Sequence, residues 1–184
     1  MTIVKLAAYA ALLRPTLYGV VRKLPGLGLG KTAYDETYPV EKYSSTLAGF
    51  ARTLFDRLPT LTQQRRAMAN ALNDELRKIP GVQLIEAPQG SQPAYARLPF
   101  LVRDASRRTA VLESLEAAGI GATASYPSAL NDVPEVLANL PAADREMSGA
   151  RRVAACIVTL PTHSYCPPDL PTRVGQILRQ SLAT

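Results

Sequence analysis

The stretch RLPTLTQQRRAMANALNDELRKIPGV, residues 57–82, decides how this 184-residue chain folds. Apolar residues recur in it at the spacing of one helical face, formed by Met68, Leu72, Leu76 and Ile79. Thr60 and Gln63 fit a capping box at the start of a helix, and Pro80 with Gly81 stops it. The stretch therefore predicts a helix over residues 60–79.

A second helix is predicted immediately upstream, over residues 44–58. Its apolar residues also form one stripe at helical spacing. The stripe consists of Leu47, Phe50, Ala51, Leu54, Phe55 and Leu58. We expect the two helices to meet at Pro59.

Downstream, short apolar runs alternate with helical stretches. The runs predict strands at residues 82–85, 95–102, 119–125 and 156–160. Helices are predicted at residues 104–118, 143–155 and 169–182. Asp104 or Ser106 can cap the first of these, and Gly119 ends it. Because no helix separates the first two strands, we expect an α/β (α+β) fold with a small, mainly antiparallel sheet covered by helices.

The first 39 residues are interpreted as an N-terminal helical segment followed by a linker rich in glycine and proline. The apolar run at 3–13 is too short to span a bilayer and is interrupted by Lys5, which favours a buried or partner-covered helix. The run GLGLGKT at 26–32 resembles a phosphate-binding loop, but Pro25 stands where such a loop needs glycine. A connector to one domain, residues 40–184, is the favoured interpretation.

Composition limits the classes of partner. The net charge is +6, but residues 61–184 carry thirteen Lys and Arg against eleven Asp and Glu, so the main body is nearly neutral. No Trp and only three Phe are present, which does not favour nucleic-acid binding. Two cysteines do not make a disulfide framework in a chain of this size. We expect a cytoplasmic protein that binds neither nucleic acid nor a membrane.

His163 is the only histidine, and it lies between Cys156 and Cys166. These spacings match no common zinc pattern and a fourth ligand is missing, so no metal site is predicted. Cys166 and His163 are also conceivable as a nucleophile and its base. Their separation of three residues in a proline-rich loop argues against a fixed geometry. The favoured interpretation is a loop that ends a strand and caps the last helix.

Four stretches of the chain occur in an order that is typical of one family. They are LRPTLYGVVRKLPGLGLGKT (13–32), the opening stretch (57–82), LESLEAAGIGATASYPSAL (112–130) and ARRVAACIVTLPTHSYCPPDL (150–170). From about Leu6 onward the chain thereby resembles the C-terminal half of the DegT/DnrJ/StrS pyridoxal-phosphate-dependent aminotransferases, which act mostly on keto-sugar nucleotides. The resemblance implies the small C-terminal domain of the fold-type-I transferase fold, preceded by the junction with a cofactor domain.

In that family the cofactor forms a Schiff base with a lysine that has a serine three places before it. An upstream aspartate keeps the ring nitrogen protonated, which makes the ring an electron sink. None of the five lysines here follows a serine in this way: Lys5, Lys23, Lys31, Lys42 and Lys78. We therefore expect no catalytic and no cofactor-binding residue in this chain, which alone would not bind pyridoxal phosphate. The family's lysine would fall before Met1.

Two further departures concern the substrate. The family's Gly-Tyr-Asn-x-Arg stretch corresponds to residues around Val40 and Glu41, with Lys42 near the arginine. Valine offers no hydrogen bond in place of the asparagine. The family's Tyr-x-Pro-Leu-His stretch resembles residues 126–131, where its histidine becomes Asn131. The resemblance thus implies that the residues nearest a substrate are Lys42, Tyr126 and Asn131.

Two hypotheses of function remain open. In the first, the chain is the C-terminal part of a sugar aminotransferase, is inactive alone and completes a site whose lysine lies on another polypeptide. In the second, it is a stand-alone dimerisation or partner-binding module. The apolar N-terminal helix supports the second, because a helix that once packed on a larger domain exposes a patch that needs cover. A homo-oligomer is expected.

Overall fold

The computed structural model describes Val4, Ala10, Val40, Lys42, residues 44–142 and residues 145–183. The chain divides into two compact units, Met1–Pro39 and Val40–Thr184, and the elements below belong to the second. Of the helix predicted at 3–13, only Val4 and Ala10 are described, and both are helical and exposed. The glycine-rich run at 26–32 lies outside the described residues. The interpretation of residues 1–39 therefore stays a prediction.

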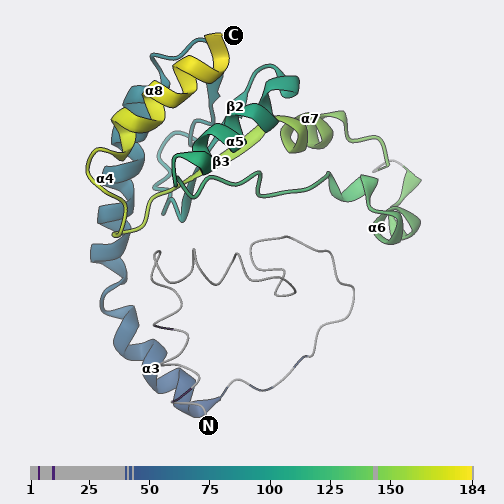
Figure 1. Ribbon diagram of the computed structural model, residues 1–184. Coiled ribbons are helices and arrows are strands. Elements are labelled where there is room, and N and C mark those ends of the chain that lie inside the picture. The colour runs from purple at the N-terminus through teal and green to yellow at the C-terminus, as the bar shows by residue number, and fades with distance from the viewer. Residues whose placement is uncertain are drawn as a thin grey trace. The chain divides into compact units, whose positions relative to one another are not determined.

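Helices and strands follow one another along the second unit as Figure 1 shows. The α-helices are α3 (Ser45–Phe55), α4 (Leu58–Leu76), α5 (Arg108–Ala117), α6 (Pro134–Asn139), α7 (Ser148–Cys156) and α8 (Leu170–Ala183). The 3-10 helices are η1 (Ala105–Arg107) and η2 (Leu130–Asp132). The strands are β1 (Val82–Leu84), β2 (Arg97–Val102) and β3 (Ile157–Pro161).

The three strands form one antiparallel sheet in the order β1-β2-β3. Val82 of β1 pairs with Val102 of β2. Arg97 of β2 pairs with Pro161 of β3. The predicted strands at 82–85, 95–102 and 156–160 are thus confirmed within one or two residues at each end, and so is the small antiparallel sheet.

The strand predicted over residues 119–125 is wrong. Only Thr123 pairs with β3, in an isolated bridge to Thr159. The backbone turns at both ends of this segment, because Gly119 and Ser125 have positive φ angles of 73° and 59°. A strand needs extended φ angles throughout, so the apolar run cannot continue the sheet beyond one residue.

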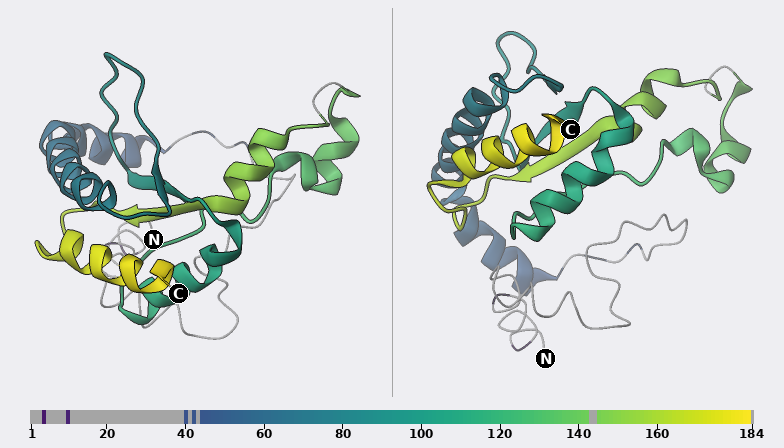
Figure 2. Two further views of the ribbon diagram at one scale, coloured as in Figure 1. Left: turned by 90° about the horizontal axis from the view of Figure 1, so that it is seen from above. Right: turned by 45° about the horizontal axis from the view of Figure 1, so that its top comes forward.

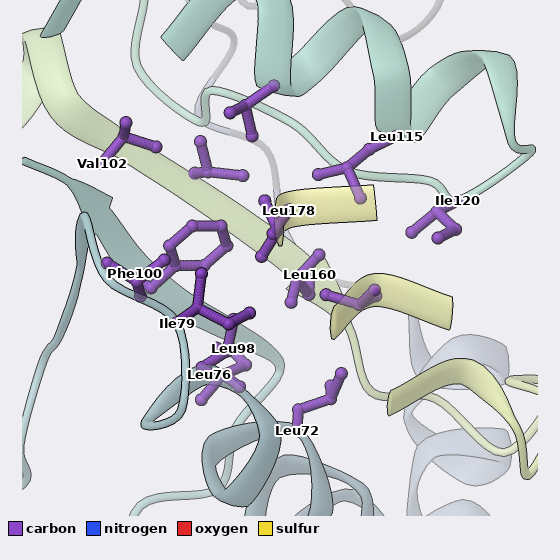
Figure 3. Close-up of a cluster of buried hydrophobic side chains, with 14 of the residues drawn as sticks. Leu72, Leu76, Ile79, Leu98, Phe100, Val102, Leu115, Ile120, Leu160 and Leu178 are labelled. Carbon is purple, nitrogen blue, oxygen red and sulfur yellow. The ribbon is translucent and has the colours of Figure 1, made fainter. Parts of the chain in front are cut away.

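The hydrophobic core lies between the sheet and the layer made by α4, α5 and α8. Figure 2 shows α5 and α8 side by side on one face of the sheet. Figure 3 shows the core side chains converging from the strands and from these helices. Leu72, Leu76 and Ile79 are buried there, and Met68 packs against them, so the predicted apolar face is confirmed. Each fully buried Leu or Phe contributes roughly 1.5–3 kcal/mol.

The start of α4 differs from the prediction. α4 begins at Leu58, and its cap residue Arg57 makes no side-chain capping bond. Thr60 therefore lies inside the helix, and the predicted capping box is wrong. Pro59 explains the difference, because its fixed φ and missing N–H suit the first turn of a helix. The upstream helix ends earlier than predicted, at Phe55.

The segment between β2 and β3 was only partly predicted. Asp104 is the residue that caps, since its carboxylate accepts a hydrogen bond of 3.0 Å from the backbone N–H of Ser106. No helix or strand was predicted between residues 126 and 142, yet this segment contains η2 and α6. The six residues of α6 are too few for a periodic signal. α7 begins at Ser148 rather than at 143. Figure 2 shows α6 and α7 extending from one end of the sheet.

Candidate functional site

The three residues expected near a substrate lie in different surroundings. Lys42 is exposed and precedes α3. Tyr126 is 54% exposed. Asn131 is 3% exposed, and its Nδ2 donates to the carbonyl oxygen of Arg145 at 3.0 Å, which fastens η2 to the segment before α7. No hydrogen bond between described residues joins the three, and their role near a substrate stays a prediction.

His163 and Cys166 have a fixed geometry, contrary to the expectation from their spacing. The Sγ of Cys166 is 3.5 Å from Nδ1 of His163, and the backbone N–H of Cys166 donates to the carbonyl oxygen of His163 at 3.0 Å. Burial raises the pKa of the Cys166 thiol and lowers the pKa of His163. A nucleophilic cysteine needs a lowered pKa, so this pair is unsuited to nucleophilic catalysis.

Metal and membrane chemistry can be checked in the described residues. Within residues 44–142 and 145–183 and the four isolated described positions, no three His, Cys, Asp or Glu side chains gather to hold a metal ion. No helix in the described part of the chain is long and apolar enough to cross a membrane. Both cysteines are free, with Cys156 buried and Cys166 partly buried.

The face of the sheet opposite the core carries a polar cluster around Arg97. The Nε of Arg97 donates to the hydroxyl oxygen of Thr159 at 2.8 Å. Its Nη2 donates to the carbonyl oxygens of Thr159, at 2.9 Å, and of Gly121. The hydroxyl of Thr159 lies 3.0 Å from those of Thr123 and Ser125. We call these five residues the Arg97 cluster.

One member of the Arg97 cluster, Ser125, and the nearby Tyr95 have strained backbones. Tyr95 and Ser125, with φ angles of 47° and 59°, are the two non-glycine residues with positive φ in the described part of the chain. Such a backbone costs about 1–3 kcal/mol, persists only where its surroundings fix it, and is concentrated at functional sites. The sequence analysis missed this cluster. The available signal was the polar Arg97 within a predicted strand, whose neighbour Leu98 faces the core.

Five exposed apolar side chains lie along α3 and the start of α4. They are Phe50, Leu54, Phe55, Leu58 and Leu61. We call this surface the α3–α4 stripe. Phe55, at 70% exposed, is the most accessible of the five. Exposed apolar side chains that gather along one stretch of sequence are candidates for an interaction site.

The structure describes two of the five lysines. Lys42 is exposed. Lys78 is also exposed, and its Nζ donates to Oε1 of Glu75 at 2.6 Å. A Schiff-base lysine is normally buried, because burial favours the neutral amine that attacks the aldehyde. The described lysines therefore do not fit pyridoxal phosphate.

The fold is that of part of an aminotransferase, as solved structures show. The aminotransferase TlmJ from Streptoalloteichus hindustanus is 26% identical with a TM-score of 0.61; the match covers 74% of this chain and 35% of TlmJ. The sugar aminotransferase CalS13 from Micromonospora echinospora is 27% identical with a TM-score of 0.57, over 68% of this chain and 32% of CalS13. DesV from S. venezuelae, solved with a ketimine intermediate, is 22% identical with a TM-score of 0.67, over 90% of this chain and 44% of DesV.

The sequence profile of the DegT/DnrJ/EryC1/StrS aminotransferase family matches residues 41–179. The chain therefore belongs to this family, whose members depend on pyridoxal phosphate. A comparison with curated protein sequences gave no match. The chain spans about a third of the length of TlmJ and CalS13, at 35% and 32%.

Proposed function

We propose that this chain supplies the small C-terminal domain of an aminotransferase for nucleotide-linked keto-sugars. It works with a cofactor-bearing part that carries the Schiff-base lysine, and it does not transaminate alone. The observation that carries the proposal is that the described lysines, Lys42 and Lys78, are exposed and do not fit the cofactor. The printed description of CalS13 as a sugar aminotransferase supports the substrate class.

The α3–α4 stripe is the surface on which the cofactor-bearing part packs. Burying a Leu or Phe side chain fully contributes roughly 1.5–3 kcal/mol, so five uncovered residues represent a large unused driving force. The match covers 35% of TlmJ, which leaves most of a related chain to provide the cover. The stripe begins at Phe50, eleven residues after Pro39, where the first unit ends.

Lys42 and Tyr126 face the substrate in the completed enzyme. Both are exposed in this chain, as residues at the edge of an uncompleted site would be. Asn131 acts indirectly, because its buried Nδ2 is used to hold the carbonyl of Arg145. None of the three transfers a proton to or from the cofactor in this proposal.

The α3–α4 stripe also favours a second candidate, a non-catalytic dimerisation or partner-binding module in which a second copy covers the stripe. Under either candidate the protein is cytoplasmic and has neither a nucleic acid nor a membrane as partner. The two candidates differ in the occupant of the stripe, which makes them separable by experiment.

Two measurements test the proposal. The purified chain, given pyridoxal phosphate, an amino-acid donor and a nucleotide-linked keto-sugar, is expected to form no amino sugar detectable by mass spectrometry. Product from this chain alone would contradict the proposal. Size-exclusion chromatography with light scattering then separates the candidates: a monomer that binds a hydrophobic dye agrees with a missing cofactor-bearing part, whereas a stable dimer that binds no dye favours the second candidate.

A further inference from the structure

We propose that the Arg97 cluster is a binding site for an oxyanion, the carboxylate or phosphate group of a small molecule. The inference goes beyond the proposed function, because it concerns a ligand that this chain binds without a partner. It starts from the hydrogen-bonding capacity of one arginine and from the groups that hold this arginine in place.

Arg97 has N–H donors that its described hydrogen bonds do not use. A guanidinium carries five N–H donors in a rigid fork, and the Nε and Nη2 of Arg97 are held by Thr159 and Gly121. Among the residues that the structure describes, none accepts a hydrogen bond from Nη1, and no ion pair includes Arg97. The bonds of Nε and Nη2 fix the guanidinium plane and thereby the direction of Nη1. A guanidinium held in this way matches the geometry of carboxylate or phosphate oxygens.

The hydroxyl of Thr159 has more polar neighbours within hydrogen-bond distance than it has donor and acceptor positions. Its oxygen lies 2.8 Å from Nε of Arg97, 3.0 Å from the hydroxyls of Thr123 and Ser125, and 3.3 Å from the carbonyl oxygen of Thr123. A hydroxyl has one donor and two acceptor positions, and Arg97 takes one acceptor position. At most one of the two neighbouring hydroxyls therefore donates to Thr159. These contacts fix the hydroxyl of Thr159, which in turn fixes Nε of Arg97.

A second basic group, His163, lies close enough to the Arg97 cluster for the charge of Arg97 to affect its pKa. Burial lowers the pKa of His163, and the positive charges of Arg97 and Arg65 lower this pKa further. Burial also lowers the pKa of Arg97. No ion pair between described residues includes any of these three. A bound oxyanion would remove the repulsion among them.

The backbone holds these groups in place from three segments. Arg97 pairs with Pro161 in the sheet, and the hydroxyl of Thr162 donates to the carbonyl oxygen of Tyr95, so the turn that carries His163 follows directly beside Arg97. The positive φ angles of Tyr95 and Ser125 add strain on both sides. A purely structural arginine would account for the bonds of Nε and Nη2, but not for a guanidinium held rigidly with no described acceptor for Nη1.

The single histidine gives a direct measurement on the wild-type chain. NMR of its imidazole reports the pKa of His163 in inorganic phosphate, in acetate and in chloride at one ionic strength. Because cations lower this pKa, a bound anion raises it, and we expect a saturable rise with phosphate, with acetate or with both. Saturation by phosphate alone identifies the phosphate class, and saturation by acetate alone identifies the carboxylate class.

Two variants locate the site. Arg97→Gln is expected to weaken anion binding about tenfold or more, the loss of at least one charge-assisted hydrogen bond. Arg103→Gln is the matched control, because Arg103 is exposed one residue beyond β2 and its removal changes the net charge equally. The control is expected to keep wild-type affinity. Arg97→Lys retains the charge but not the fork and is expected to give intermediate affinity.

The proposal is overturned if the wild-type chain shows no saturable rise in the pKa of His163 with phosphate or acetate. It is also overturned if Arg103→Gln lowers the affinity as much as Arg97→Gln does. Circular dichroism checks that the variants fold, and the wild-type titration decides the matter if Arg97→Gln does not. The outcome is independent of the proposed function, since no step requires transamination or a partner.

Discussion

The consecutive helices α3 and α4 carry the same kind of apolar pattern, but its two ends lie in opposite surroundings. Leu72 and Leu76, in the C-terminal half of α4, are buried in the core, whereas Phe55 and Leu58 of the α3–α4 stripe are exposed. Helical periodicity determines which residues share a face, but other segments determine what covers that face. The buried residues form the core of this domain, and the exposed residues are the surface that we propose a partner covers.

The largest expected effect comes from truncating the same residue type in each region. Phe100→Ala removes a fully buried ring and is expected to lower the free energy of unfolding by about 3–5 kcal/mol. Phe55→Ala removes an exposed ring and is expected to change it by no more than about 0.5 kcal/mol. Urea denaturation of both variants measures the difference. Equal losses in the free energy of unfolding would mean that the chain itself covers the stripe, which would contradict the difference between the two regions.

A charge on the stripe tests its role as an interaction surface. Leu54→Glu is expected to leave the unfolding free energy nearly unchanged and to reduce the binding of a hydrophobic dye, because it interrupts the exposed apolar surface. Fluorescence of the dye and light scattering measure the change. Glu113→Gln, an exposed polar substitution on α5, serves as the control. Unchanged dye binding in Leu54→Glu would assign the dye site to another surface.

The smallest expected effect concerns the contact that fastens the buried half of α4 to α8. The hydrogen bond from Lys78, and to a lesser degree that from Arg179 on α8, lowers the pKa of Glu75 below its usual value of 4.5. The unfolded chain therefore takes up the proton first, so this contribution to stability is present above pH 4.5 and is lost as the pH falls below it.

Glu75→Gln is expected to be slightly less stable than the wild type at neutral pH, by a small amount because the group is near the surface. The difference should disappear in acid, where the wild-type carboxyl is protonated. Thermal unfolding midpoints at neutral pH and near pH 3 measure both values. A gap that stayed constant across this range would assign the loss to packing rather than to charge.

Local patterns predicted the helices and strands of the core well, because burial requires apolar residues at regular spacing in the helices and in short runs in the strands. The face of Leu72, Leu76 and Ile79 and the short apolar strands are direct consequences of burial. The predicted capping box at Thr60 was wrong because α4 begins two residues earlier, at Leu58. Pro59 is accommodated in the first turn of the helix instead of ending one. The strand at 119–125 failed because the positive φ of Ser125 depends on its neighbours and not on its own residue type.

The candidate sites were less predictable, because they depend on residues far apart in the sequence. The Arg97 cluster joins residues 97, 121 and 159 through side-chain and backbone hydrogen bonds that no local pattern encodes. The distance between Cys166 and His163 likewise depends on a turn that proline-rich spacing does not reveal. The family resemblance, by contrast, was predictable from four stretches in order, and the family profile confirms it.

The account depends most on the claim that no lysine of this chain is placed to hold pyridoxal phosphate. The direct measurement is to incubate the chain with the cofactor, reduce it with borohydride, remove unbound cofactor and map modified lysines by peptide mass spectrometry. We expect no aldimine absorption that survives gel filtration and no stoichiometric label on any of the five lysines, Lys5, Lys23, Lys31, Lys42 and Lys78. A stable aldimine band with one lysine fully labelled would contradict the account.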